Sequence, residues 1–259
     1  ARQRYRFGSI VEITQDGFLG GRLTLAQPKD GYRAGIDPVL LAAACPAKQG
    51  EDVLELGCGV GVASLCLAAR LPGVRLHGVE ILPDYAQLAR ANAAQNKVEF
   101  EVQVSCVSAR PTAFYDREFH QIIMNPPYFE AHASSISADA GRASGRAEQV
   151  ALYHWIDLAA KRLRPKGYLT LIQRVERLPD ILLGFQGRLG SISVQPLAPR
   201  DGRAPHLVLV RARKSGRAAF QLLGTKSLHL GLAHAQDRPD YAPEISAILR
   251  DGAEFFWHS

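Results

Sequence analysis

The tetrapeptide Asn125-Pro126-Pro127-Tyr128 combines residue types that can hold and orient a planar amino group. The Asn125 side-chain oxygen and the Pro126 carbonyl can each accept one N–H from an exocyclic amine or an amide, whose delocalised lone pair makes it a poor nucleophile. The two prolines restrict the backbone, so both acceptors are fixed before the amine arrives. Tyr128 can stack on a planar base. We therefore predict Asn125, Pro126 and Tyr128 as catalytic residues and Pro127, Tyr128 and Phe129 as substrate contacts; the alternative is a rigid turn with a buried tyrosine.

A glycine-rich turn, Glu55-Leu56-Gly57-Cys58-Gly59-Val60-Gly61, closes a short apolar run and leads directly into a helical stretch. Glycines at alternate positions allow a tight turn and leave no Cβ to collide with a ligand that lies across it. Glu80 stands at the tip of the next apolar run, 19 residues after Gly61, where a carboxylate can accept both hydroxyls of a ribose. A nicotinamide enzyme would instead favour the spacing GxGxxG. The remaining alternative is that Glu55 is structural and that Glu80 only caps a helix.

Alternating strands and helices are expected to position these residues. We predict strands at residues 52–56, 74–79, 100–104, 119–124 and 167–173, and helices at residues 37–44, 60–71, 83–96 and 148–163. Repeated β-α units of this length imply a mostly parallel sheet with helices on both faces. Residues 191–197 and 206–213, joined by a Pro/Gly-rich loop, are predicted to close the sheet as a pair of strands. Residues 129–147 lack periodicity and are predicted to form a long surface loop.

The composition excludes several classes of protein. With 259 residues, 47% of them hydrophobic, the chain can bury a full core as one large α/β domain or two small ones. No apolar run reaches the roughly 18 residues of a membrane span, and the basic N-terminal residues lack the apolar run of a signal peptide, so we expect a soluble, cytoplasmic protein. The four cysteines show no CxxC spacing and the histidines no nucleophile or metal spacing, so we expect neither a metal site nor disulfides.

Positive charge is concentrated in one part of the chain. The net charge is +6, but residues 157–217 contain thirteen bases and four acids, a local charge of +9, so the remainder sums to −3. The bases are Lys161, Arg162, Arg164, Lys166, Arg174, Arg177, Arg188, Arg200, Arg203, Arg211, Arg213, Lys214 and Arg217. If this segment faces one way, it would attract the phosphates of a nucleic acid. The alternative is a solvated surface without a partner.

The glycine-rich turn and Glu80 together resemble the fingerprint of S-adenosylmethionine-dependent methyltransferases of the Rossmann-like kind. The resemblance implies that Glu55 lies near the methionine end of S-adenosylmethionine, that Glu80 holds the ribose, and that the first and fourth strands are neighbours, which places Asn125 beside the turn. The predicted cofactor-binding residues are Arg33, Asp37, Glu55, Gly57, Gly59, Gly61, Glu80, Ile81, Cys106 and Asn125. Such enzymes usually have an Asp after the third strand. This chain has Ser105-Cys106-Val107-Ser108 there, so adenine recognition would rest on backbone groups.

Over most of its length the chain resembles the bacterial tRNA adenine methyltransferases that modify the adenine next to the anticodon of a valine tRNA. The resemblance lies in Gln27-Pro28-Lys29-Asp30-Gly31-Tyr32-Arg33, Gly35-Ile36-Asp37, Leu40-Leu41-Ala42, the glycine-rich turn, Asn125-Pro126-Pro127-Tyr128-Phe129, Tyr241-Ala242-Pro243-Glu244 and Ile248-Leu249-Arg250. It implies an α/β Rossmann-like methyltransferase fold, with a mostly parallel seven-stranded sheet, helices on both faces and an antiparallel closing strand. It also implies a tRNA partner. The sequence does not fix the oligomeric state, for which a monomer is favoured. The single domain, 1–259, would comprise a cofactor-covering segment, 1–50, a core, 51–215, and a C-terminal extension, 216–259.

Three other activities fit the same motifs. Glutamine methyltransferases that act on a release factor share them, but usually carry a helical recognition domain ahead of the cofactor domain, and only 52 residues precede Val53 here. Methylation of a guanine amino group in ribosomal RNA is a variant of the same chemistry. A catalytically idle fold that binds RNA is the third alternative, and the intact Asn125 and glycine-rich turn argue against it.

Overall fold

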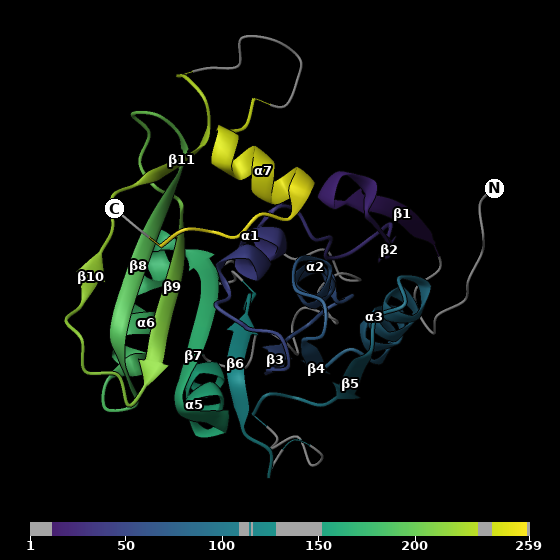
Figure 1. Ribbon diagram of the computed structural model, residues 1–259, viewed down its shortest axis with the longest axis horizontal. Helices are drawn as coiled ribbons and strands as arrows, with labels where there is room; N and C mark the ends of the chain where they lie inside the picture. The colour runs from purple at the N-terminus through teal and green to yellow at the C-terminus, as the bar shows by residue number, and fades with distance from the viewer. Residues whose placement is uncertain (1–11, 109–113, 115, 128–151, 233–239, 258–259) are drawn as a thin grey trace, which may run out of the picture.

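The protein, seen here as a computed structural model, is described over residues 12–108, 114, 116–127, 152–232 and 240–257 (Figure 1). Its strands are β1 (Ile13–Phe18), β2 (Leu23–Pro28), β3 (Asp52–Leu56), β4 (Arg75–Glu80), β5 (Phe100–Val104), β6 (Phe119–Met124), β7 (Leu163–Arg174), β8 (Leu189–Arg200), β9 (Leu207–Lys214), β10 (Gln221–Leu222) and β11 (Lys226–His229). Its helices are α1 (Asp37–Ala44), α2 (Val62–Arg70), α3 (Pro83–Gln95), α5 (Leu152–Arg162), α6 (Leu178–Phe185) and α7 (Pro243–Asp251), with 3-10 turns η1 (Leu19–Gly21) and η3 (Val175–Arg177).

One large sheet organises the fold. Its strand order is β10-β8-β9-β7-β6-β3-β4-β5, with β11 also paired to β8. β3 pairs in parallel with β4 and β6, β6 pairs in parallel with β7, and β9 runs antiparallel between β7 and β8. The central strands β3 and β6 are almost wholly buried, as expected of apolar runs covered on both faces. The mostly parallel sheet, its antiparallel closing strand and the contact between the first and fourth predicted strands are therefore confirmed.

The sheet is larger than the sequence predicts. The seven expected strands are present, and two short strands, β10 and β11, extend the sheet beside β8. Strands of two and four residues are too short to show a period-two pattern, which explains why the sequence gives no sign of them. A separate hairpin of β1 and β2, joined by η1, is also absent from the sequence-based prediction.

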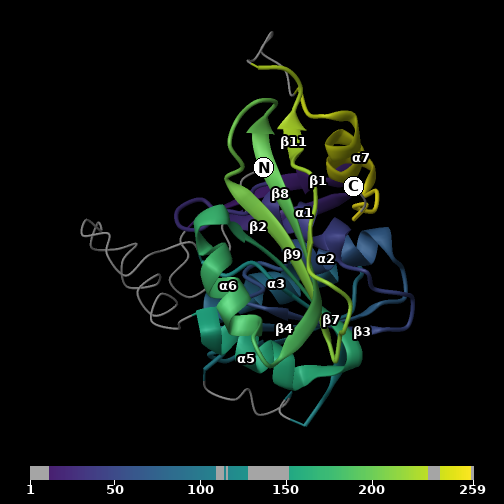
Figure 2. The same cartoon turned by 90° about the vertical axis from the view of Figure 1, so that its left-hand side faces the viewer.

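Helices cover both faces of the sheet (Figure 2). α1, α2 and α7 pack on one face, where Leu40, Leu65 and Ile245 belong to one buried cluster. α5 and α6 pack on the other face, where Ile156 and Ile181 are fully buried. Helices on both faces are thereby confirmed. Among the described residues, no helix is both long and apolar enough to cross a membrane.

The three predicted regions share a core. Leu25 from the first region, Leu65 from the second, and Ile245 and Trp257 from the third lie in the same buried cluster. The division of one domain into a covering segment, a core and an extension stays a prediction. The loop predicted at residues 129–147 lies outside the described residues.

Candidate active site

The carboxyl ends of β3, β4, β6 and β7 lie together at one edge of the sheet, here called the carboxyl edge. The ladders pair Leu56 with Val79 on one side and with Met124 on the other. The residues that follow these three positions therefore meet at one place, which is where open α/β sheets bind their ligands. In Figure 1, β7 points towards the top of the view and β9 towards the bottom. The opposite edge, where β3, β4, β6 and β7 begin, is called the amino edge below.

The glycine-rich turn lies at the carboxyl edge and is held against β4. The backbone N–H groups of Gly57 and Cys58 both donate to the Val79 carbonyl, at 2.8 and 3.0 Å. Gly57, Gly59 and Gly61 all have positive φ values of 68°, 54° and 89°, the region that favours glycine. The conformation of the turn thus explains the residue type at all three positions.

The three glycines face different surroundings. A Cβ on Gly57 would lie 2.6 Å from the indole of Trp155, and one on Gly61 would lie 3.1 Å from the Phe100 ring. A Cβ on Gly59 would meet nothing within 4 Å. Gly57 and Gly61 therefore make room for packing side chains, whereas Gly59 alone of the three borders open space in the described structure.

Glu80 holds this turn from the end of β4. Its carboxylate accepts hydrogen bonds from the backbone N–H groups of Gly59 at 2.8 Å and Leu82 at 2.9 Å. Each carboxylate oxygen receives one of these bonds and so retains a further lone pair for a ligand. Glu80 is only 7% exposed, and its burial raises the pKa of the carboxyl group, although backbone donors including Ile81 oppose the shift.

Glu55 lies beneath the turn. One of its oxygens accepts bonds from the Ser64 backbone N–H at 3.0 Å and from the Ser64 hydroxyl at 2.5 Å. Burial raises the pKa of the Glu55 carboxyl group to about 8, against the bonds from Ser64, and the nearby Glu80 adds to the shift. A buried acid without a cationic partner is costly, and such groups are common at binding sites.

Two side chains outside the Asn-Pro-Pro-Tyr motif form hydrogen bonds with Asn125 and Pro126. The Asn125 side-chain amide donates from Nδ2 to the Tyr32 hydroxyl at 3.4 Å. The Gln173 side chain, at the end of β7, donates from Nε2 to the Pro126 carbonyl at 3.1 Å. Neither residue is among those predicted from sequence. Tyr128 and Phe129, which are predicted there, lie outside the described residues.

Tyr32 follows the hairpin, which Asn92 on α3 ties to the glycine-rich turn. The buried Asn92 amide accepts from the Ala26 N–H at 2.7 Å and donates to the Ala26 and Val60 carbonyls, both at 3.0 Å. Tyr85, also on α3, donates to the Tyr32 carbonyl at 3.3 Å. These contacts position Tyr32, which follows β2 in the chain, over the carboxyl edge.

The phenol of Tyr32 stays protonated at neutral pH. Burial of its hydroxyl end, with Asp37 and Glu55 nearby, raises the pKa of Tyr32 to about 12, although the residue keeps 57% of its surface exposed. A neutral hydroxyl can accept the Asn125 N–H and still donate its own proton. The same electrostatic contacts place Asp37, the first residue of α1, close to Tyr32.

Two other predicted cofactor residues have local partners. Arg33 donates to Thr14 Oγ1, to the Pro28 carbonyl and to Asp16 Oδ2 at 2.7, 2.9 and 2.8 Å, so its guanidinium braces the hairpin. Cys106 follows β5 and is half-buried, with its sulfur 3.0 Å from the Ser108 hydroxyl. Their assignment to the cofactor stays a prediction.

The described residues contain no group of three or more metal-ligating side chains. The four cysteines are free, and Cys45, Cys58 and Cys66 are buried, where burial raises the pKa of each thiol. The apolar or glycine-rich sequence around the cysteines predicts mostly buried thiols, and three of the four are buried. Their reduced state stays a prediction.

The predicted basic segment does not face one way. Arg174, Arg177, Arg200 and Arg203 lie at the carboxyl edge, where β7 and β8 end. Lys161, Arg162, Arg164, Lys166, Arg188, Arg213, Lys214 and Arg217 lie at or next to the amino edge, where α5 and β9 end and where β7 and β8 begin. The segment crosses the sheet three times, so its charge is divided between two edges. The segment therefore does not form a single basic face.

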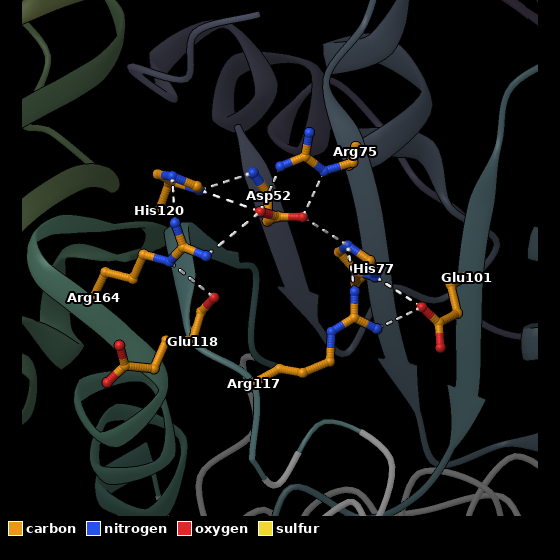
Figure 3. Close-up of polar contacts among 8 residues, drawn as sticks. All are labelled: Asp52, Arg75, His77, Glu101, Arg117, Glu118, His120 and Arg164. Atoms are coloured by element: carbon orange, nitrogen blue, oxygen red, sulfur yellow. Dashed lines mark hydrogen bonds and ion pairs between the residues drawn. The ribbon is translucent and has the colours of Figure 1, made fainter. Parts of the chain in front are cut away.

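A network of ion pairs occupies part of the amino edge (Figure 3). Asp52 accepts two bonds from Arg75, both at 2.8 Å, and lies 3.5 Å from His77 and 3.4 Å from His120. The Arg75 hydrogen bonds lower the pKa of Asp52 to about 2, even though partial burial opposes the shift. Arg164 is 4.0 Å from the same carboxylate. His77 and His120 thus both belong to this network.

The strand order, a glycine-rich turn that borders open space, and paired amide and carbonyl acceptors at the neighbouring strand end together define a Rossmann-like methyltransferase. The chain belongs to the methyltransferase small domain family, whose model matches residues 34–185.

Individual relatives of the chain are also methyltransferases by name. The chain is 34% identical over 240 residues to the tRNA1(Val) (adenine(37)-N6)-methyltransferase of Porphyromonas gingivalis, covering 87% of this chain and 92% of that one. It is 28% identical over 251 residues to the enzyme of the same name from Yersinia enterocolitica, covering 91% of both chains. The resemblance stated from the motifs is thus confirmed.

Solved structures share the fold. The crystal structure of an Agrobacterium tumefaciens protein described as a predicted O-methyltransferase superposes with a TM-score of 0.65 at 26% identity, covering 85% of this chain and 98% of that one. A 16S rRNA N2 methyltransferase of Thermus thermophilus, solved with AdoMet and guanosine, gives a TM-score of 0.55 at 19% identity, covering 78% of this chain and 50% of that one.

Proposed function

We propose that this protein transfers a methyl group from S-adenosylmethionine to the exocyclic amino nitrogen of the adenine next to the anticodon in a tRNA. The observation that carries the proposal is the pair of acceptors on Asn125 and Pro126, fixed at the same edge as the open space beside Gly59. The names of the relatives support adenine in tRNA as the acceptor.

The residues of the carboxyl edge fit S-adenosylmethionine. Gly59 leaves room for a ligand against its backbone, and Glu80 keeps unused lone pairs with which to accept ribose hydroxyls. Glu55 would lie towards the methionine end, where its carboxylate form would face the positive charge of the sulfonium. When bound, the cofactor supplies an electrophilic methyl group.

Asn125 and Pro126 would act by orienting the adenine amine. One N–H donates to the Asn125 side-chain oxygen and the other to the Pro126 carbonyl, which aims the nitrogen lone pair at the methyl carbon. The nitrogen oriented in this way would accept the methyl group that the cofactor supplies, with a neutral thioether as the leaving group, and would then release one proton to water. No strong base is needed, because methylation itself makes that proton acidic. Tyr128 would stack on the adenine ring.

RNA phosphates have a candidate contact at the amino edge. Five cations are candidates: Arg164, Lys166, Arg213 and Lys214 lie where β7 begins and β9 ends, and Arg217 follows three residues after β9. Arg213 donates to the Lys166 carbonyl at 3.0 Å and Lys214 to the Leu163 carbonyl at 2.7 Å. Among the described residues, only Arg164 of the five lies within 4.0 Å of a carboxylate. Like charges held together without counter-charges repel one another, and a polyanion would relieve that repulsion.

The decisive experiment incubates the protein with labelled S-adenosylmethionine and either a valine tRNA transcript or a release factor. We expect label in the tRNA as N6-methyladenosine, lost when the adenine next to the anticodon is replaced by guanine. Label in the release factor alone would contradict the proposal. Raising salt should weaken tRNA binding steeply, and reversing the charges of Lys166 and Arg213 should flatten that dependence.

Asn125→Ala tests the reaction step itself. We expect turnover to fall by about 100-fold or more, because one of two preorganised acceptors is lost. Cofactor affinity, measured by calorimetry, should change little. A variant with wild-type turnover would refute the assigned role of Asn125.

A further inference from the structure

The prolines of the motif interrupt the ladder between β6 and β7. Paired residues in this ladder end at Met124 and Leu171. Pro126 and Pro127 carry no N–H, so the strand cannot continue to donate towards β7. Two residues beyond Leu171, Gln173 stands beside Pro126 and supplies a donor from its side chain instead.

The Gln173 side chain is fixed in a single orientation. Its Oε1 accepts the Arg174 backbone N–H at 2.9 Å, which leaves Nε2 directed at the Pro126 carbonyl, 3.1 Å away. Its backbone is paired with Val208 of β9 in the interior of the sheet. The residue is 0% exposed. Both ends of the amide are thus held by rigid neighbours.

A buried amide at this position needs an explanation. Its strand neighbours Leu171 and Ile172 are both fully buried and apolar, and an apolar side chain at position 173 would avoid the loss of hydration that a buried amide suffers. The backbone ladder already joins β6 and β7 up to Met124 and Leu171. What the side chain adds is one hydrogen bond to the carbonyl that is proposed to receive the substrate amine.

We propose that Gln173 is a positioning residue for methyl transfer. It occupies one lone pair of the Pro126 carbonyl and thereby fixes the direction of the second lone pair, which receives the amine N–H. Without this bond the peptide unit can tilt or bind water, and the amine loses its alignment with the methyl carbon. The inference rests on the proposed function, and it adds a residue from a different strand to the site.

Gln173→Met tests the role, because methionine has a similar volume and no donor. We expect kcat to fall about 10- to 100-fold. The Kd for S-adenosylmethionine and the KM for tRNA should stay within about threefold of wild type, because the bond acts through alignment of the amine. The matched control is Gln195→Met. Gln195 is also 0% exposed and lies in β8, which β9 separates from β7. It donates to the carbonyls of Pro196 and Gly224 and not to Pro126. Gln195→Met should lose about as much thermal stability as Gln173→Met and keep the wild-type kcat.

Gln173→Glu separates positioning from packing. A protonated carboxyl group can donate to the Pro126 carbonyl, whereas the carboxylate cannot. Burial raises the pKa of such a group above about 4.3, so kcat of this variant should rise as the pH is lowered from about 8 to about 5.5. Wild-type kcat over the same range is the reference, and the ratio of variant to wild type should increase towards acid.

Three results would overturn the proposal: wild-type kcat in Gln173→Met, an equal loss of kcat in Gln195→Met, or a pH-independent ratio in Gln173→Glu. Wild-type turnover on tRNA is measured first. If the wild type leaves tRNA unmethylated, the proposed function fails and this inference fails with it. Wild-type turnover with an unimpaired Gln173→Met contradicts the role of Gln173 alone.

Discussion

The two edges of the central sheet hold their acidic side chains in opposite ways. At the amino edge, Asp52 is surrounded by cations and histidines, with Arg75 bound to both of its oxygens (Figure 3). At the carboxyl edge, Glu55 and Glu80 are more deeply buried, at 3% and 7% exposure. Their hydrogen-bond donors in the described structure are backbone N–H groups and the Ser64 hydroxyl.

The pKa shifts follow from this difference in partners. Arg75 lowers the pKa of Asp52 to about 2, whereas burial raises the pKa of Glu55 to about 8 and also raises that of Glu80. A paired acid adds to the stability of the fold. A buried acid without a cation lowers stability but keeps its lone pairs for a ligand. The amino edge therefore contributes to stability, and the carboxyl edge gives up stability for binding.

Glu80→Ala should have the largest effect on cofactor binding. It removes the two acceptors proposed for the ribose, and bonds to a charged group contribute about 1.5–3 kcal/mol, so the Kd for S-adenosylmethionine should rise about 100-fold. Calorimetric titration measures this, with Asp52→Asn as the control from the amino edge. Unchanged affinity in Glu80→Ala would remove Glu80 from the cofactor site.

Wild-type stability should depend on pH through Glu55 in the direction opposite to that of a paired acid. Glu55→Gln should remove this dependence. Because the folded pKa of Glu55 is raised above its unfolded value, wild type is most stable below about pH 4.3 and loses this contribution as pH rises towards 8. The glutamine variant lacks that loss. Its free energy of unfolding relative to wild type should therefore increase between about pH 5 and pH 8, by on the order of 2 kcal/mol. Urea titrations across this range measure the difference, and parallel curves would show that Glu55 is not a raised-pKa acid.

Gly59→Ala tests whether the open space beside the turn is the cofactor site. Gly59 and Gly187 both have positive φ, at 54° and 71°, and neither would place a Cβ within 4 Å of another atom. Alanine at either position should cost about 1 kcal/mol of stability from backbone strain. Only Gly59→Ala should weaken S-adenosylmethionine binding, by about tenfold. Equal affinities in the two variants would move the cofactor away from Gly59.

The strands and the turn could be predicted because local pattern dictates them. β3 and β6 are short, mostly apolar runs that end just before Gly57 and before Asn125-Pro126, and their predicted limits match the structure at both ends. The placement of Asn125 at the same edge as the glycine-rich turn followed from strand order, which the family resemblance provided. Gly59 and Glu80 were likewise predicted as site residues from the spacing between the glycine-rich turn and the acid.

The parts of the site that could not be predicted depend on contacts between segments that are distant in the sequence. Gln173 reads in the sequence as the polar end of a strand, and only the β6–β7 pairing brings it to Pro126. A polar residue that closes an apolar strand beside a proline motif was the one available signal. Tyr32 reaches Asn125 through a hairpin whose docking depends on Asn92. The distribution of the bases over two edges could not be predicted for the same reason, because a linear count of charge cannot show that the chain reverses between them.

Asp52→Asn should affect stability and leave the reaction unchanged. Since the folded pKa of Asp52 lies below its unfolded value of about 3.9, its contribution is present above that pH and is lost as pH falls through about 2. Arg75 is 57% exposed, so solvent screening limits the loss at pH 7 to about 1 kcal/mol. The difference from wild type in urea titrations should shrink between about pH 4 and pH 2. A loss of turnover at equal stability would show that the amino edge contributes to the reaction. It would contradict the division of roles between the two edges.

Tyr32→Phe should have the smallest effect, at the carboxyl edge. The phenol accepts the Asn125 N–H over 3.4 Å, a long hydrogen bond worth about 0.5 kcal/mol. Its loss lets the Asn125 amide rotate, so that Nδ2 instead of Oδ1 faces the amine in part of the population. We expect kcat to fall about two- to threefold with an unchanged Kd for S-adenosylmethionine. Because Tyr32 keeps its ring in the variant, a larger loss of cofactor affinity than of kcat would show that the hydroxyl contacts the cofactor and does not orient Asn125.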